Sequence, residues 1–362
     1  MRALIAMPSL RRGGAERHAV YLATAAAAAG HEVDVVSLQG GGLTGELDAA
    51  GIPTRVLDLP GGARAVPQIT TALAAVIAET QPDVISAHDV NVELGLRGAL
   101  LRRAVPTLVW KHTYGHIGHR GLRDRVVERA SGRLITRYGA VCHTQVRYLT
   151  GTLGIPSSKI SVLPNTVAPC PEGPWPQGPL TVAMVAAMRP DKGHADALAA
   201  WERVLRSRPD ARLLLAGDGP HLAWVRDEVS RRGLGDNVEL LGEVADPMEL
   251  LARSQALLLA SYNIECFPYV ALEAMSMGRP VISTDVGGLP EMVEDRVTGV
   301  LVPPRDPAAL GDAVLSVADD AILRRMGAAG RERLARCFPM EDWSRRAVDL
   351  LADVHLDKEG CR

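Results

Sequence analysis

The sequence predicts an α/β protein made of two doubly wound domains, and three observations carry this prediction. Apolar runs of strand length alternate with helix-like segments along the whole chain. The proline-rich segment APCPEGPWPQGP (168–179) divides the chain near its middle and reads as a linker. Net charge changes sign there, from 18 Lys and Arg against 12 Asp and Glu before residue 171 to 22 against 30 from residue 171 onward. We therefore expect two Rossmann-like domains that face each other across a ligand-binding cleft.

The elements follow in order along each half. The expected strands are 2–8, 33–38, 83–87 and 107–110 in the first half, and 181–187, 211–216, 256–260 and 280–283 in the second. Helix-like segments between them predict parallel sheets. The expected domains are 1–170, which would bind an acceptor, and 171–345, which would bind a donor. The tail 346–362 continues a helix with one apolar face. We expect this tail to pack back toward the first domain, and simple capping of the second domain is the alternative.

Composition limits the classes of protein. At 362 residues, with 47% hydrophobic and 23% charged residues, the chain is globular. Its five cysteines are scattered without C-x-x-C spacing, which favours a reducing cytoplasm over a disulfide framework or a cysteine zinc site. No signal peptide and no membrane span is evident, so we expect a cytoplasmic protein. The stretch 97–147 has eleven Lys and Arg against two acids. It is either a solvated face or a patch for anionic lipid or a phosphorylated acceptor, which leaves peripheral membrane contact open.

Two loops after strands suit phosphate. In SLRRGGAERH (9–18), Gly13 and Gly14 let backbone N–H groups approach an anion at the start of a helix. This loop lacks the G-x-G-x-x-G fingerprint, which argues against a dehydrogenase. In AAMRPDKGHADAL (186–198), Arg189 and Lys192 follow the carboxyl end of a strand and suit a diphosphate.

Two glutamates stand eight positions apart in NIECFPYVALEAMSMGRP (263–280). Pro268 suits the first position of a helix, so Glu265 lies in the loop before it and Glu273 one turn inside. Side chains on a helix lean toward its N-terminus, where the free amides of Tyr269 and Val270 would hold a phosphate. Glu273 would then meet the hydroxyls of a ribose, since a carboxylate accepts from two neighbouring hydroxyls.

The motifs RRGGAER, LPNTV (163–167), MRPDKG (188–193), LLLAGDGP (213–220), ECFPYVALEAM (265–275) and GRPVISTDVGGLPE (278–291) resemble those of the GT-B glycosyltransferases of group 1, family 4. The resemblance implies a retaining, metal-independent enzyme that takes a sugar from a nucleotide donor, commonly UDP- or GDP-linked. It implies that Arg189 and Lys192 hold the diphosphate, Glu273 the ribose, and Glu265 with the Phe267 and Pro268 backbone the transferred sugar. Gly13 and Gly14 would close on the phosphates, the backbone of Val244 would meet the base, and His112 matches the active-site histidine.

Two positions depart from the family. Cys266 and Thr166 stand where the family usually has glycine, and Cys266 lies in the expected sugar pocket. His112, His116 and His119 form H-x3-H-x2-H, a spacing that is also compatible with zinc, although Gly115 and Gly118 argue against a continuous helix. Otherwise His116 and His119 belong to a polar loop that lines the acceptor cleft. His88 is either a second residue of that cleft or a cap at the end of its strand.

The function that we predict is retaining transfer of a hexose or an N-acetylhexosamine, from a nucleotide sugar that we expect to be UDP-linked, to an acceptor hydroxyl in cell-envelope glycan or glycolipid synthesis. We expect neither a cofactor nor a metal, nor a nucleic-acid partner. Alternatives that stay open are transfer to a small natural product such as an aminoglycoside, an epimerase or phosphorylase on the same scaffold, and a binding protein without turnover.

Overall fold

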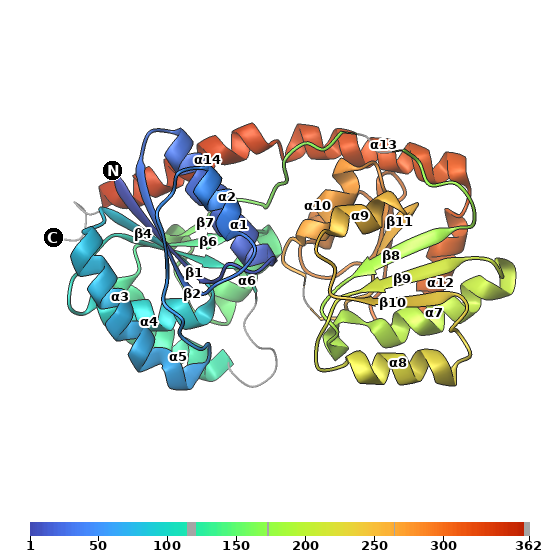
Figure 1. The fold of residues 1–362 in the computed structure, drawn as a ribbon, viewed down its shortest axis with the longest axis horizontal. Coiled ribbons are helices and arrows are strands. Elements are labelled where there is room, and N and C mark those ends of the chain that lie inside the picture. The colour runs from blue at the N-terminus through green and yellow to red at the C-terminus, as the bar shows by residue number, and fades with distance from the viewer. Residues whose placement is uncertain (114–120, 172–173, 264, 358–362) are drawn as a thin grey trace. The chain divides into compact units, whose positions relative to one another are not determined.

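The computed structural model divides into two compact units, residues 1–165 with 341–362 and residues 166–340. It describes residues 1–113, 121–171, 174–263 and 265–357, without the side chains of 121–124. His116 and His119 lie outside the described residues. Each unit is a parallel sheet with helices on both faces, as the alternation of apolar runs predicted (Figure 1).

Unit 1 contains a seven-stranded sheet within the described residues, in the order β3-β2-β1-β4-β5-β6-β7. The strands in that order are β3 (Thr54–Val56), β2 (Glu32–Gln39), β1 (Arg2–Ser9), β4 (Val84–His88), β5 (Thr107–Lys111), β6 (Arg137–Ala140) and β7 (Ile160–Val162). Every pairing is parallel, with Ile5 of β1 opposite both Val35 and Ser86. The order of strands reverses between β1 and β4, so the loops after these two strands leave the sheet in opposite directions and open a crevice at its carboxyl edge.

Helices cover both faces of this sheet (Figure 1). They are α1 (Gly14–Ala28), α2 (Thr44–Ala49), α3 (Val66–Thr80), α4 (Val90–Leu100), α5 (Gly121–Ser131), α6 (His143–Gly151) and α14 (Met340–Leu356). The helices α3 and α4 pack on one face through apolar residues such as Ile69 and Leu96. On the other face, Trp343 of α14 meets the ring of His18 on α1 at a centroid distance of 5.2 Å. The apolar face expected for the last helix is therefore buried against unit 1.

Unit 2 contains a six-stranded parallel sheet in its described part, in the order β10-β9-β8-β11-β12-β13. Its strands are β8 (Thr181–Val185), β9 (Arg212–Ala216), β10 (Val238–Gly242), β11 (Ala256–Leu259), β12 (Val281–Thr284) and β13 (Gly299–Val302). Its helices are α7 (His194–Ser207), α8 (Leu222–Arg231), α9 (Pro247–Ala252), α10 (Tyr269–Ser276), α11 (Leu289–Met292), α12 (Pro307–Ser316) and α13 (Asp320–Cys337). Here the reversal lies between β8 and β11.

The described part of the proline-rich segment forms neither helix nor strand, as expected of such a sequence. It belongs to unit 2, where the ring of Trp175 lies under the guanidinium groups of Arg279 and Arg324 at 4.8 and 4.7 Å. The described chain has no helix with the length and apolar composition needed to cross a membrane.

Candidate active site

The switch point of unit 2 brings two predicted residues together. Lys192 follows β8 and Glu265 follows β11, and the two strands are neighbours. Lys192 Nζ lies 2.5 Å from Glu265 Oε1, and Ser261 Oγ donates to the same oxygen at 2.5 Å. The side chain of Lys192 is 17% exposed and that of Glu265 is 10% exposed. The cation and the carboxylate are thus held together in a mostly buried position, with a hydroxyl fixing the carboxylate.

Two glycines allow the backbone to reach this geometry. Gly193 has φ +73°, and a Cβ there would lie 1.9 Å from the carbonyl oxygen of Ala260. Gly287 has φ +60°, and a Cβ there would lie 1.9 Å from the carbonyl oxygen of Glu265. Any larger residue would push apart the loops that carry Lys192 and Glu265.

Arg189 lies in the same loop but more openly. Its Nε and Nη2 donate to the two carboxylate oxygens of Asp191 at 2.9 and 2.5 Å, and its side chain is 50% exposed. This hydrogen bond raises the pKa of Arg189. Burial alone would raise the pKa of Asp191, but the Arg189 hydrogen bond and charge lower it. The guanidinium is therefore charged, oriented and accessible to an anionic ligand.

The helix α10 begins one residue later than expected, since Pro268 is its N-cap and Tyr269 its first residue. Glu273 is partly exposed on the second turn, and Cys266 and Phe267 are buried in the loop before the helix. Val244 is partly exposed in the loop after β10, beside the loop after β9, where the N–H of Gly217 donates to the carbonyl oxygen of Gly242 at 2.7 Å.

The glycine loop of unit 1 has a carboxylate of its own. Gly13 is the N-cap of α1, and Glu16 folds back over it so that a Cβ at Gly13 would lie 2.3 Å from Glu16 Oε2. Ser9 Oγ donates to Glu16 Oε1 at 2.9 Å. Burial raises the pKa of Glu16. A phosphate bound at Gly13 and Gly14 would have to displace this carboxylate, which lies beside Gly13.

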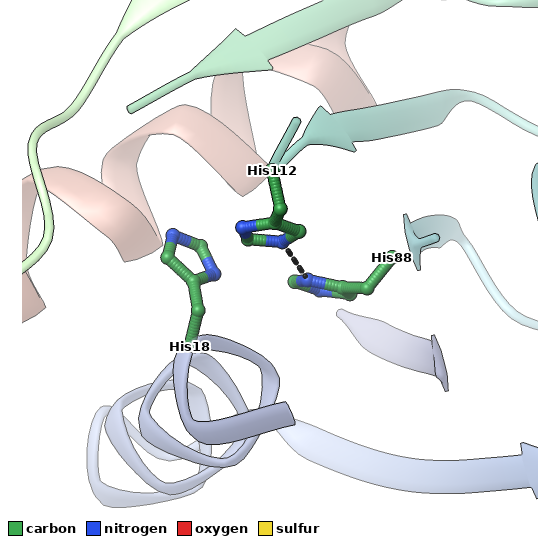
Figure 2. A group of neighbouring side chains, drawn as sticks. All are labelled: His18, His88 and His112. Atoms are coloured by element: carbon green, nitrogen blue, oxygen red, sulfur yellow. Dashed lines mark hydrogen bonds between the residues drawn. The ribbon is translucent and has the colours of Figure 1, made fainter. Parts of the chain in front are cut away.

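Three histidines meet at the switch point of unit 1 (Figure 2). His18 comes from α1, His88 ends β4 and His112 follows β5. His88 Nδ1 and His112 Nε2 are hydrogen-bonded at 3.0 Å, and the ring of His18 lies edge-on to that of His112 at a centroid distance of 4.9 Å. His18 and His88 are fully buried, whereas His112 is partly exposed. Of the two described histidines expected on the acceptor side, His112 alone reaches the surface.

Burial keeps this cluster uncharged. It lowers the pKa of His112 to about 3, and burial together with the neighbouring imidazoles lowers the pKa values of His18 and His88 well below the usual range. One ligand nitrogen from each ring lies within 4.8 Å of the others, so the group could hold a metal ion. The run His112, His116 and His119, whose spacing is compatible with zinc, is a different group, and His112 is the member that the two groups share.

The basic stretch is partly neutralised inside unit 1. Arg97 is buried and pairs with Glu93 at 2.6 Å and with Glu128 at 2.8 Å, while Lys111 Nζ lies 2.6 Å from Glu93. Tyr138 donates its hydroxyl to Glu128 in the same network. These two cations therefore support the fold and cannot form a surface patch. The arginines of the stretch that are described as exposed are Arg102, Arg103, Arg125, Arg129, Arg133 and Arg147.

Sequence reasoning gave no role to His18, Ser86, Ser261 or Asp191. These four residues matter because each contacts another residue of the site at the edge of its sheet. No spacing in the sequence indicates these contacts. Two surface cavities of about 230 Å³ each, one lined by residues such as Arg208 and the other by residues such as Lys159, contain none of the predicted site residues.

Two doubly wound units of this kind are the architecture of the GT-B class of glycosyltransferases. The family model described as "Glycosyl transferases group 1" matches residues 171–333, and the one described as "Glycosyltransferase Family 4" matches residues 12–169. The chain belongs to this family of group 1, family 4 glycosyltransferases.

Relatives agree with this membership. A glycogen synthase of Mycobacterium tuberculosis is 38% identical over 183 residues, which is 49% of this chain and 43% of that protein. An N-acetyl-alpha-D-glucosaminyl L-malate synthase of Bacillus anthracis is 35% identical over 174 residues, 48% of this chain and 45% of that protein. The matches thus span less than half the length of these curated relatives. The crystal structure of Anabaena HepE in complex with UDP-glucose aligns over 98% of this chain and 100% of that chain with TM-score 0.85 and 19% identity, a likeness of fold.

Proposed function

We propose that the chain is a retaining glycosyltransferase that moves a hexose or an N-acetylhexosamine from a nucleotide sugar, first of all a UDP sugar, to an acceptor hydroxyl. The pairing of Lys192 with Glu265 carries this proposal. A donor has an anionic diphosphate next to a ring of hydroxyls, and a cation beside a carboxylate suits both parts. HepE, a structural neighbour, is named as a complex with UDP-glucose, which supports this class of donor.

Donor binding exchanges the partners of the cations. Lys192 would leave Glu265 to meet the diphosphate, and Glu265 would accept from sugar hydroxyls. Arg189 would grip a second pair of phosphate oxygens in place of Asp191. The remaining donor contacts that we propose are the amides of α10 at Tyr269 and Val270 for phosphate, Glu273 for ribose, Val244 for the base, the loop of Cys266, Phe267 and Pro268 for the sugar, and Gly13 and Gly14 for the phosphates from unit 1.

Positive charge near the leaving group replaces a metal in this mechanism. Negative charge develops on the diphosphate as the glycosidic bond breaks, and Lys192, Arg189 and the helix N-terminus stabilise it. Glu265 is held by Lys192 and Ser261, so we assign it to the hydroxyls of the sugar and not to nucleophilic attack. Unit 1 supplies His112 as the group that meets the reacting hydroxyl.

Two classes of acceptor remain candidates. A hydroxyl of a cell-envelope glycan or glycolipid fits the exposed arginines of the basic stretch and a cytoplasmic enzyme at the membrane face. The ion pairs of Arg97 and Lys111 with Glu93 neutralise two of the charges that suggested a lipid surface, which favours a small hydroxylated acceptor. The relative from Bacillus anthracis is named for a malate product, a small molecule of this kind.

A donor panel tests the proposal. UDP-, GDP- and ADP-linked sugars are incubated with the protein and with glycan, glycolipid and small-molecule acceptors, with and without EDTA, and the products are identified by mass spectrometry and by the anomeric coupling in NMR. We expect α-linked product from an α-linked UDP sugar, at a rate that EDTA leaves unchanged. Inverted product, or activity that EDTA removes and manganese restores, contradicts the mechanism.

A further inference from the structure

Two of the three histidines of unit 1, His88 and His112, are joined by a hydrogen bond between their rings. We infer that His88 is a positioning residue, which holds His112 Nε2 through its own Nδ1 and so presents the Nδ1 edge of His112 to the ligand. This inference rests on the proposed function for the role of His112 in turnover. It concerns a residue that lies behind the reacting group.

His88 is buried, whereas His112 is partly exposed. Ser86 Oγ lies 3.2 Å from His88 Nε2, and His88 Nδ1 lies 3.0 Å from His112 Nε2. The rings of His88 and His112 are stacked with an interplanar angle of 16°. Ser86 and His88 are 0% exposed, so neither can touch a substrate. The chain of hydrogen bonds therefore runs from the core of the sheet to the partly exposed ring of His112.

This chain couples the tautomers of the two imidazoles. Each neutral ring has one N–H, and a hydrogen bond between two rings needs one donor and one acceptor. If the Ser86 hydroxyl donates to His88 Nε2, His88 donates from Nδ1, and His112 keeps its proton on Nδ1. If His88 Nε2 donates to Ser86, His112 donates from Nε2, and its Nδ1 becomes an acceptor. Either way, the hydrogen bond to His88 determines whether His112 offers a donor or an acceptor to the reacting hydroxyl.

Packing fixes His112 from the other side. The ring of His18 lies 4.2 Å from that of Trp110 and 5.2 Å from that of Trp343, measured between centroids, and both of these are buried. Neither ring nitrogen of His18 has a hydrogen-bond partner in the described structure. We assign His18 to packing against His112, since its nitrogens make no polar contact that could relay a proton.

A bound metal is the competing explanation for the same cluster. Three neutral imidazoles with an open position resemble a catalytic zinc site. However, His88 and His112 are already paired with each other, and an ion would have to break that bond. The hydrogen-bonded arrangement needs no such change.

Three substitutions of His88 test the inference. The amide of asparagine occupies the place of Nδ1 in a histidine ring and that of glutamine the place of Nε2. H88N therefore keeps a partner for His112, whereas H88Q keeps only the contact with Ser86, and H88L keeps neither. We expect H88Q and H88L to lower kcat at least about tenfold, the loss of one net hydrogen bond, with UDP affinity and melting temperature near wild type. H88N should recover most of the rate.

Long-range ¹H–¹⁵N spectra of histidine-labelled protein give a readout that needs no turnover. We expect the His112 resonances, assigned by H112A, to show one neutral tautomer in wild type and H88N and a mixture in H88Q and H88L. An altered tautomer with unchanged kcat would refute the role proposed for His112 in turnover and leave the positioning intact. The inference itself fails if H88N is as slow as H88Q, if the tautomer is the same in all variants, or if the purified protein contains one zinc per chain that H18A or H88L removes.

Discussion

The same position of the doubly wound sheet is built in opposite ways in the two units. In unit 2, the switch point between β8 and β11 holds two ion pairs, Lys192 with Glu265 and Arg189 with Asp191. In unit 1, the switch point between β1 and β4 holds the neutral rings of His18, His88 and His112. Ion pairs lie where a diphosphate would leave, whereas the three histidine rings beside the proposed reacting hydroxyl are uncharged. The topology therefore determines where a site lies, and the local residues determine its chemistry.

The largest effect that we expect comes from removing a cation at the switch point of unit 2. Arg189→Ala and Lys192→Ala should each cost about 3 kcal/mol of transition-state stabilisation, which is the usual effect of removing one electrostatic partner. The loss is measured as the decrease in kcat/KM. Arg203→Ala is the matched control, because Arg203 also makes a two-pronged pair with an aspartate, Asp312, and is 42% exposed compared with 50% for Arg189. Equal decreases of kcat/KM in R189A and R203A would show a general effect of surface charge and would contradict a specific role of Arg189.

The next prediction concerns the uncharged histidines at the switch point of unit 1. His112→Ala should lower turnover by about 10²-fold or more, as expected for a positioned catalytic group, because the reacting hydroxyl loses its partner. UDP affinity by calorimetry should stay near wild type, since the donor residues that we propose are mainly in unit 2. His143→Ala, at an exposed histidine of the same unit, is the control. Loss of UDP binding together with turnover in H112A would point to a structural role.

A smaller effect concerns the ribose. Glu273→Gln keeps the shape of the side chain and removes its charge, which weakens hydrogen bonds worth roughly 1.5–3 kcal/mol each. We expect UDP affinity to fall about tenfold or more, measured by calorimetry, with the melting temperature little changed. Affinity equal to wild type would exclude Glu273 from the nucleotide site.

Stability as a function of pH tests whether the histidine cluster is uncharged in the folded protein. The pKa of His18 is well below its usual 6.5 in the folded state because of burial, so the unfolded chain binds the proton more tightly. The free energy of unfolding should therefore be constant above pH 6.5 and decrease below it, by up to about 1.4 kcal/mol per pH unit for each such histidine. The pKa of Asp191 is lowered from 3.8, so its stabilising contribution is lost only in stronger acid.

Urea unfolding at pH 5.0 and 7.5 measures this dependence. We expect H18L to reduce the difference in the free energy of unfolding between the two pH values, because leucine cannot take up the proton in the unfolded chain. H143L serves as the exposed control. A pH dependence that H18L leaves unchanged would contradict the neutral state of the cluster.

Much of the fold and part of the site could be read from the sequence. Alternation of apolar runs predicted two parallel doubly wound sheets because a strand followed by a covering helix is buried on both faces and reads as a continuous apolar run. The strands that the pattern missed are short or interrupted by polar residues and glycine: 54–56, 137–140, 160–162, 238–242 and 299–302. Arg189, Lys192 and Glu265 do lie in loops after the carboxyl ends of strands, where ligands bind in such sheets, and their roles in binding a donor stay predictions.

The partners of these residues were decided by the tertiary structure alone. Lys192 and Glu265 are 73 positions apart and meet because β8 and β11 are neighbours across the reversal of strand order. His18, His88 and His112 come from three elements, and the local spacing of histidines instead suggested the run from His112 to His119. The apparent basic patch contains Arg97 and Lys111, whose neutralisation by Glu93 and Glu128 depends on helix packing. The sequence determines which side chains follow the end of a strand, because the position of a strand can be read from local periodicity. The order of the strands in the sheet determines which of these side chains are in contact.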